Sequence, residues 1–294
     1  MPLVLTIIVK PNNASLLEML CQKALTILNS SGCHISNIDM LSEGEALDIF
    51  FEGMADKTLI KAALKECDWA IQSVKTREKS LLLADMDSTI ITVECIDELA
   101  DFVGKKDQVA AITEKAMQGL INFNDALVER VALLKGLSLD TLQQCYDERV
   151  TLTSGAKELV ATMRARGAYT AMVSGGFTFF TDRVSKKLGL DQTSANILDH
   201  ADGKLTGRVL TPIVNADTKK ATLLALQKHH QLPTNAILAV GDGANDIPML
   251  QAAGLGVAFY AKPSTAKAAS LGINHGDLTA LLFLQGIKRG AFVG

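Results

Sequence analysis

The stretch from Leu81 to Thr89, with the sequence LLLADMDST, decides the fold of this chain. Its first four residues are apolar and predict a short buried strand. Asp85 and Asp87 follow one residue apart, so a turn beyond the strand can bring both carboxylates toward one point. Two carboxylates that close repel each other unless a cation or a shared proton intervenes. The pattern therefore indicates a hard-metal site, an acid/base pair, or both, although a capped strand-to-helix turn uses the same residue types.

A second apolar run, residues 236–240, ends in a similar way. It leads into the sequence GDGAND, residues 241–246, whose glycines permit a tight turn and a close approach of the backbone. Asp242 can join Asp85 around one Mg²⁺, an ion that prefers carboxylate oxygens and keeps some of its waters. Asn245 and Asp246 can position those waters or a nearby lysine. Because two strands of one chain end in this way, a purely structural role for these turns is the weaker interpretation.

Two further segments suit a phosphate group. The run 170–173 leads into Ser174-Gly175-Gly176, where a hydroxyl and the free amides of a glycine turn can meet a phosphate oxygen. Lys219 can supply the compact positive charge that a phosphoryl group needs. Taken singly, Ser174 would be a helix cap and Lys219 a solvated surface charge. The prediction depends on their order along the chain, between the carboxylate pair and the GDGAND segment.

This order of motifs resembles the haloacid dehalogenase (HAD) superfamily of phosphotransferases, from about Leu81 to the C-terminus. Residues 85–89, 94–100, 172–177 and 241–246 are similar in particular to the phosphoserine phosphatase family. The resemblance implies hydrolysis of O-phospho-L-serine, the last step of serine biosynthesis, through a Mg²⁺-dependent aspartyl-phosphate. It implies an α/β fold with a Rossmann-like core, a parallel sheet and an inserted helical cap.

The resemblance also implies roles for single residues. We assign Asp85 as the nucleophile and Asp87 as the general acid that later becomes the base. Mg²⁺ would be held by Asp85, Asp242 and the backbone carbonyl of Asp87, with Asp246 orienting metal waters or the lysine.

Ser174, Gly175 and Lys219 would stabilise the transferring phosphoryl charge, and Asn245 would also lie at the substrate.

Substrate selection is expected from the cap, since phosphoserine offers an ammonium and a carboxylate beside its phosphate. Glu94 is the candidate partner of the ammonium, and Arg130 can fork onto the carboxylate. The family pattern places Met117 and Phe123 over the substrate. Without the resemblance, core packing for Met117 and Phe123 and a solvent-facing Arg130 would be the simpler interpretation.

The sequence before Leu81 predicts a separate structural unit. Strands expected at 3–9, 33–41, 46–51 and 69–74, with helices at 14–28 and 57–65, give the ferredoxin-like order β-α-β-β-α-β. This α+β unit resembles ACT-type regulatory domains, although residues 11–14, PNNA, stand where those domains often carry Asp-Arg-x-Gly. The charged run 75–79 is the expected linker. We therefore expect an ACT-like domain at 1–76 and a HAD phosphatase domain at 77–294, with few contacts crossing between them.

Beyond Leu81, apolar strands alternate with helices, which predicts a parallel sheet covered on both faces, with ligands at the carboxyl ends of its strands. Between about 93 and 152 only helical stretches occur, at 96–102, 108–117, 124–134 and 139–146, and these form the expected cap. Residues 196–200 and 205–210 flank an Asp-Gly turn and predict a β-hairpin.

The composition limits the classes of partner that this chain is expected to bind. A net charge of −3 over 294 residues argues against a nucleic-acid-binding chain. The five cysteines are odd in number and lack Cys-x-x-Cys spacing, which indicates reduced thiols in a cytoplasmic protein. No signal peptide or bilayer-length apolar run is evident, so we expect no membrane partner. The expected partner is a small-molecule substrate, and a homodimer is left open.

Three alternative functions remain at this point. A related phosphatase or phosphotransferase could act on another small phosphomonoester, such as a sugar phosphate, and would not need both Glu94 and Arg130. A phosphohomoserine-transferring or phosphoserine-exchanging enzyme would be distinguished by the dependence of its activity on an acceptor molecule. A non-catalytic serine sensor would not need the complete set of residues Asp85, Asp87, Ser174, Lys219 and Asp242, so that set speaks against it.

Overall fold

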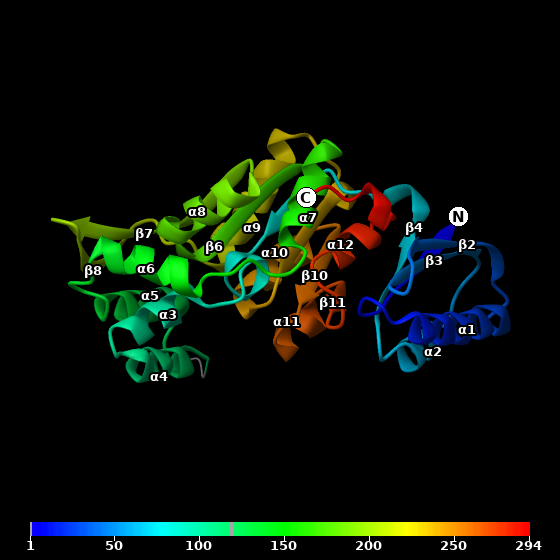
Figure 1. Ribbon diagram of the computed structural model, residues 1–294, viewed down its shortest axis with the longest axis horizontal. Coiled ribbons are helices and arrows are strands. Elements are labelled where there is room, and N and C mark those ends of the chain that lie inside the picture. Colours follow the sequence, from blue (N-terminus) through cyan, green and yellow to red (C-terminus); the bar gives the residue numbers. More distant parts are fainter. Residues whose placement is uncertain (1, 118–119) are drawn as a thin grey trace.

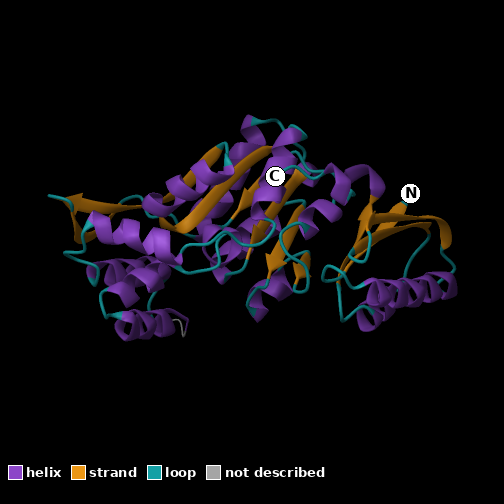
Figure 2. Ribbon diagram, viewed as in Figure 1, coloured by secondary structure: helices purple, strands orange, loops and turns teal. Residues whose placement is uncertain are grey.

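The computed structural model describes residues 2–117 and 120–294, and the side chain of Met117 lies outside this description. The chain forms a four-stranded and a seven-stranded sheet. Figure 1 shows the smaller sheet at one end of the longest axis and the helices of residues 95–149 at the other. In Figure 2 the helices of the smaller sheet lie on one face, whereas helices flank the larger sheet on both faces. The predicted fold class is therefore confirmed.

The N-terminal sheet has the predicted β-α-β-β-α-β order. Its elements are β1 (Leu3–Ile8), α1 (Ala14–Ser30), β2 (His34–Ser42), β3 (Ala46–Glu52), α2 (Lys57–Ala63) and β4 (Asp68–Ser73). All its strand pairs are antiparallel, in the order β2-β3-β1-β4. Alternate residues of β1, such as Leu5 and Ile7, share a core with Leu17 and Leu20 of α1. One face of the sheet is thus buried by its own helices.

The larger sheet has the order β11-β10-β9-β5-β6-β7-β8 and is parallel except at its last strand. Its strands are β5 (Leu81–Ala84), β6 (Tyr169–Phe177), β7 (Gln192–Ala201), β8 (Lys204–Leu210), β9 (Ile237–Gly241), β10 (Leu255–Phe259) and β11 (Leu271–Ile273). All four residues of β5 are buried, and β5 pairs with both β6 and β9. Asp85, Ser174 and Asp242 therefore come to one edge of the sheet. The predicted hairpin is present as β7 and β8, with positive φ at Asp202 and Gly203.

Two groups of helices complete this part of the chain. Those between the strands are α7 (Ala156–Ala165), α8 (Thr178–Leu188), α9 (Ala216–His229), α10 (Ile247–Ala252), α11 (Pro263–Ala268) and α12 (Ala280–Phe283). The cap consists of α3 (Cys95–Phe102), α4 (Lys106–Met117), α5 (Phe123–Ala132) and α6 (Leu139–Arg149). Among the helices of the described ranges, none has the length and apolar character needed to cross a bilayer.

The two units touch more extensively than the sequence predicts. Arg77 of the expected linker is buried and pairs with Asp48 of β3 at 2.6 Å. Lys79, at the end of the same run, is also buried and donates from Nζ to the carbonyl of Asn235 at 2.8 Å, which ties the run to the larger unit. Ile8 and Ala70 of the N-terminal sheet share a core cluster with Leu278 and residues 280–284. The expectation of few crossing contacts is wrong because the sheet has helices on one face only, and the C-terminal segment covers the other.

Candidate active site

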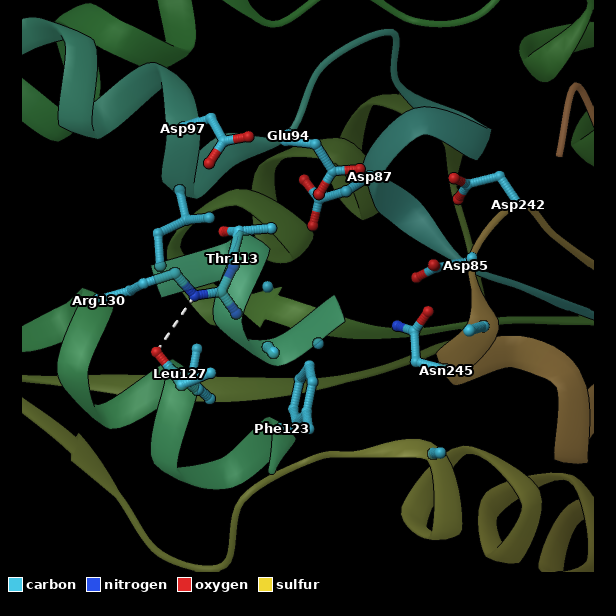
Figure 3. A pocket seen from close by; sticks show the side chains of 18 of the residues that line it. Asp85, Asp87, Glu94, Asp97, Thr113, Phe123, Leu127, Arg130, Asp242 and Asn245 are labelled. Atoms are coloured by element: carbon cyan, nitrogen blue, oxygen red, sulfur yellow. Dashed lines mark hydrogen bonds between the residues drawn. The ribbon is translucent and has the colours of Figure 1, made fainter. Parts of the chain in front are cut away.

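The carboxyl edge of the larger sheet opens into a cavity of about 480 Å³. Cavities of this size commonly hold small ligands. Core residues from the ends of β5, β6 and β9 line one side, and residues of α3, α4 and α5 line the other. Figure 3 shows side chains from both sides directed into this space. The cap thus covers the strand ends where the sequence predicts the catalytic residues.

Asp85 and Lys219 form the centre of the core side. Asp85 follows β5, and its Oδ1 accepts the N–H of Met86 at 2.7 Å and lies 2.7 Å from Lys219 Nζ. Lys219 is fully buried and also pairs with Asp246 at 2.7 Å. Burial opposes the charge on the ammonium, but Asp246 and Asp85 outweigh it and raise the pKa of Lys219. Lys219 therefore stays positive, and the predicted role of Asp246 in orienting it agrees with the ion pair.

An acidic cluster lies at the same place. Among the described residues, the carboxylates of Asp85, Asp242 and Asp246 can bring one oxygen each within 4.8 Å of one another. Burial, with added repulsion from Asp246, raises the pKa of Asp85 and brings that of Asp242 to about 6. Lys219 offsets only part of this negative charge. A set of hard oxygen donors with surplus negative charge fits a divalent cation.

Asp87 is directed away from that cluster. Its Oδ1 accepts the amide N–H of Cys95 at 3.0 Å, and its Oδ2 accepts the hydroxyl of Ser174 at 3.2 Å. Burial, followed by repulsion from Glu94, raises the pKa of Asp87 to about 7. A carboxyl group that titrates near neutral pH is suited to give and take protons. The predicted metal contact through the backbone carbonyl of Asp87 stays a prediction.

The glycine turn expected after Ser174 is wrong, because β6 stays extended through Phe177 with a register shift after Val173. Small residues are needed for a different reason: a Cβ on Gly176 would lie 2.5 Å from Asp87 Oδ2. Ser174 is fully buried, and its Oγ accepts the N–H of Gly176 at 2.8 Å. Gly175 and Gly176 line the cavity, so Ser174 supports Asp87 from beneath its surface.

The cap side brings Glu94, Phe123 and Arg130 together around the same cavity. Glu94 precedes α3 and accepts the hydroxyl of Ser88 at 2.7 Å. Arg130 is half-buried and donates from Nε to the carbonyl of Ala126 at 3.2 Å, the dashed line in Figure 3. Among the described residues, no carboxylate lies within ion-pair distance of Arg130, so its terminal nitrogens can serve a ligand.

The remaining predicted contacts have three different outcomes. Asn245 lines the cavity as expected, and the Phe123 ring lies 3.2 Å from the position that a Cβ on Gly175 would take. Lys219 lies beneath the cavity surface rather than in its lining. Met117 ends α4, and its predicted contact with the substrate falls on a side chain that lies outside the described residues.

Sequence reasoning missed Asp97, Thr113 and Lys262, which also line the cavity. Asp97 lies in the first turn of α3, three residues after Glu94, which is the N-cap residue of this helix. Burial raises the pKa of Asp97, and the charge of Arg130 opposes that rise. Lys262 follows β10, a strand whose carboxyl end lies at the same edge as that of β9. A survey of every residue that follows a parallel strand could have found Lys262.

Comparisons with known proteins agree with this architecture. Residues 82–251 match the family of haloacid dehalogenase-like hydrolases. The phosphoserine phosphatase of Polaromonas sp. is 44% identical over 220 residues, which cover 73% of this chain and 93% of the relative. A HAD-family hydrolase from Salmonella enterica serovar Typhi is similar across 97% of this chain and 98% of its own, with a TM-score of 0.83 and 31% identity.

A solved phospho-aspartyl intermediate analogue of phosphoserine phosphatase gives a TM-score of 0.65 at 40% identity, covering 70% of this chain and 98% of that one. The family match at residues 82–251 spans the cap and the strands β5, β6 and β9 whose ends line the cavity. The chain belongs to the haloacid dehalogenase-like hydrolases and, within them, to the phosphoserine phosphatase family.

Proposed function

We propose that this protein hydrolyses O-phospho-L-serine to L-serine and phosphate, with Mg²⁺ as its cation. One observation carries the proposal: a single cavity joins the carboxylate pair at the end of β5 to Glu94 and Arg130 of the cap. The core side suits a phosphoryl group. The cap side offers one anion and one cation, which match the ammonium and the carboxylate of a free amino acid.

In the first step, Asp85 attacks phosphorus while the ester P–O bond breaks. Its Oδ1 already holds Met86 N–H and Lys219, which leaves Oδ2 to act as the nucleophile. Asp87, whose pKa is raised to about 7, gives its proton to the departing serine oxygen. The product is an aspartyl-phosphate on Asp85 and free serine. Because Asp85 and Asp87 are two residues apart, Asp85 can attack phosphorus while Asp87 reaches the departing serine oxygen.

In the second step, Asp87 accepts a proton from water, and the water oxygen attacks phosphorus. The bond between phosphorus and Asp85 breaks, which releases phosphate and restores the carboxylate. Lys219 keeps Asp85 fixed and contributes positive charge beneath the transferring group throughout. Stabilising charge on the phosphoryl group is the main catalytic task in this chemistry.

The cation would be held by Asp85 and Asp242, with the backbone carbonyl of Asp87 as a further ligand. Asp246 would remain a supporting residue because Lys219 and the N–H of Gly243 already occupy its two oxygens. A bound Mg²⁺ would neutralise charge on the phosphoryl oxygens and favour the ionised form of Asp85.

We also propose that residues 1–76 form an ACT-like unit and residues 77–294 the phosphatase. The β-α-β-β-α-β order supports this division. The extensive contact between the two units argues that they act as one folded body rather than as domains on a free linker.

A substrate panel tests the proposed function. Phosphate release is measured with Mg²⁺ or with EDTA from L-phosphoserine, O-phosphoethanolamine, 3-phosphoglycerate and glucose 6-phosphate. We expect the highest kcat/KM for L-phosphoserine and loss of turnover in EDTA. Preference for the sugar phosphate, or turnover that EDTA leaves unchanged, would refute the proposal.

A further inference from the structure

The loop after β11, residues 274–279, contacts both the N-terminal unit and the base of the cap. On the side of the N-terminal unit, the loop is held by Asp68. This residue is the first of β4 and is almost fully buried. The Asp68 carboxylate accepts three consecutive backbone N–H groups, from Asn274 at 2.7 Å, His275 at 3.1 Å and Gly276 at 2.7 Å. Hydrogen bonds to an ionised acceptor are stronger than neutral ones. One side chain of the N-terminal unit therefore fixes the backbone of this loop.

The other side of the loop holds the chain where it returns from the cap. Ser154 donates its hydroxyl to Asp277 Oδ2 at 2.6 Å, and its carbonyl accepts the N–H of Leu278 at 3.1 Å. Asp277 Oδ1 in turn accepts the N–H and the hydroxyl of Thr279. Gly155 has a φ of +79°, and a Cβ there would lie 2.6 Å from the nitrogen of Thr279. The loop and the returning segment are thus closely fitted to each other.

Ser154 belongs to one of the two segments through which the chain enters and leaves the cap. We call residues 90–92 and 151–154 the cap root. Thr153 donates its N–H to the carbonyl of Ile90 at 2.9 Å, and Thr92 donates to the carbonyl of Thr151 at 3.1 Å. Ile90 lies three residues beyond Asp87. Continuous polar contacts therefore run from Asp68 through the loop to the cap root.

We propose that Asp68 is a positioning residue for the cap. By fixing the loop that holds Ser154, it sets the position of the cap root, and with it that of Glu94 and Arg130 relative to Asp85. The N-terminal unit thereby contributes to substrate recognition from outside the cavity. The kinetic part of this inference rests on the proposed function, but the structural part can be measured without any substrate.

The first test compares Asp68→Ala with Asp56→Ala in the full-length protein. Asp56 is the matched control because its carboxylate also accepts backbone N–H groups, those of Thr58 and Leu59, but within the N-terminal unit. Hydrogen exchange is followed at the amides of Thr92 and Thr153. We expect Asp68→Ala to accelerate exchange at these amides by about 3- to 10-fold and Asp56→Ala to leave it unchanged.

Kinetics supply the second readout. Asp68→Ala should raise KM for L-phosphoserine by about 3- to 10-fold and change kcat/KM for p-nitrophenyl phosphate by less than about 2-fold, since that ester has no serine groups to misplace. Unchanged exchange at the cap root together with an unchanged KM would overturn the proposal. If phosphoserine is not the substrate, the exchange data still decide whether Asp68 positions the cap root.

A double-mutant cycle with Ser154→Ala tests the path itself. If Asp68 acts through Ser154, the double variant should show the exchange rates of the stronger single variant rather than the product of both effects. Fully multiplicative effects would contradict the path. Should Asp68→Ala not fold, Asp68→Asn, which keeps one acceptor oxygen, takes its place in the cycle with the same expected outcomes.

Discussion

The two sides of the cavity differ in how completely their charged groups are paired. On the core side, the pocket floor (Asp85, Asp87, Ser174, Lys219 and Asp246) is buried, and each of these residues has a polar partner within the floor. On the cap side, the cap wall (Glu94, Phe123 and Arg130) is more exposed. Among the side-chain hydrogen bonds of the described residues, the Glu94 carboxylate has only that from Ser88, and Arg130 has only that to the backbone of its own helix.

This difference separates chemistry from recognition. Groups that must act on a transferring phosphoryl gain from being fixed beforehand, because no reorganisation is then needed during the reaction. Groups that recognise a substrate need free hydrogen-bonding capacity until it binds. We therefore expect floor substitutions to affect every phosphate ester, and cap-wall substitutions to affect only esters that carry the matching charge.

Asp85→Asn should have the largest effect. A neutral amide is a poor nucleophile and a weaker cation ligand, so turnover of every ester should fall to background. Asp182→Asn, an exposed aspartate of α8, is the control and should retain wild-type activity. The measurement is Mg²⁺-dependent phosphate release, and near-normal activity of Asp85→Asn would remove the mechanism proposed above.

Asp87→Asn should have the second largest effect. The variant loses a proton donor and acceptor, help that contributes about 10²- to 10⁴-fold to rate. Substrate binding should persist because the Asp87 carboxylate hydrogen-bonds Ser174 and Cys95, and Glu94 and Arg130 of the cap wall are unchanged in this variant. Kinetics should show a fall in kcat with little change in KM. A variant with unchanged kcat and raised KM would instead make Asp87 a binding residue.

Arg130→Ala should lower kcat/KM for L-phosphoserine by roughly 10- to 150-fold, which corresponds to a charged hydrogen-bonded contact of about 1.5–3 kcal/mol. Arg149→Ala, at an arginine of α6 that is not among the residues lining the cavity, is the control. Steady-state kinetics of both variants give the comparison. An equal loss in both would point to cap stability rather than to recognition.

The smallest effect concerns pH and the cation. Burial raises the folded-state pKa of Asp242 to about 6, above the ordinary value of about 3.9. Without a cation, the folded state therefore binds more protons than the unfolded chain between these values, and its stability falls as pH rises through that window. Mg²⁺ needs ionised ligands, so it should stabilise the protein more at higher pH.

We expect the rise in Tm on adding Mg²⁺ to be larger at about pH 7.5 than at about pH 5, with up to about 2.7 kcal/mol gained at a concentration of 100 times Kd. Thermal unfolding with and without Mg²⁺ at both pH values measures this. A larger Mg²⁺ effect at the lower pH would contradict an acidic cation site.

Much of the pocket floor could be predicted from the sequence because its residues follow apolar strands. Parallel strands bring their carboxyl ends to one edge, so Asp85, Ser174 and Asp242 had to meet there. The reason for a glycine at position 176 could not be predicted, since it is the Asp87 carboxylate, whose Oδ2 lies 2.5 Å from the position that a Cβ would take. That contact joins residues far apart in the sequence.

Two further residues of the cavity and the contact between the two units were less predictable. Asp97 lies within the 94–100 motif but was given no role, and Lys262 lies outside every motif, so their position in the folded cavity identifies them. Arg77 belongs to the charged run 75–79, which the sequence indicates as a linker. It is buried because the N-terminal sheet exposes a face that the C-terminal segment covers, and its partner Asp48 lies on that face.

The most direct test is the ratio of kcat/KM for L-phosphoserine to that for O-phosphoethanolamine, which keeps the ammonium and lacks the carboxylate. It is measured in the wild type, in Asp87→Asn and in Arg130→Ala. If the floor performs the chemistry and the cap wall the recognition, Asp87→Asn lowers both values and leaves the ratio within about 2-fold, whereas Arg130→Ala lowers the ratio by roughly 10- to 150-fold. A ratio that falls as far in Asp87→Asn as in Arg130→Ala, or that does not change in Arg130→Ala, would contradict this division.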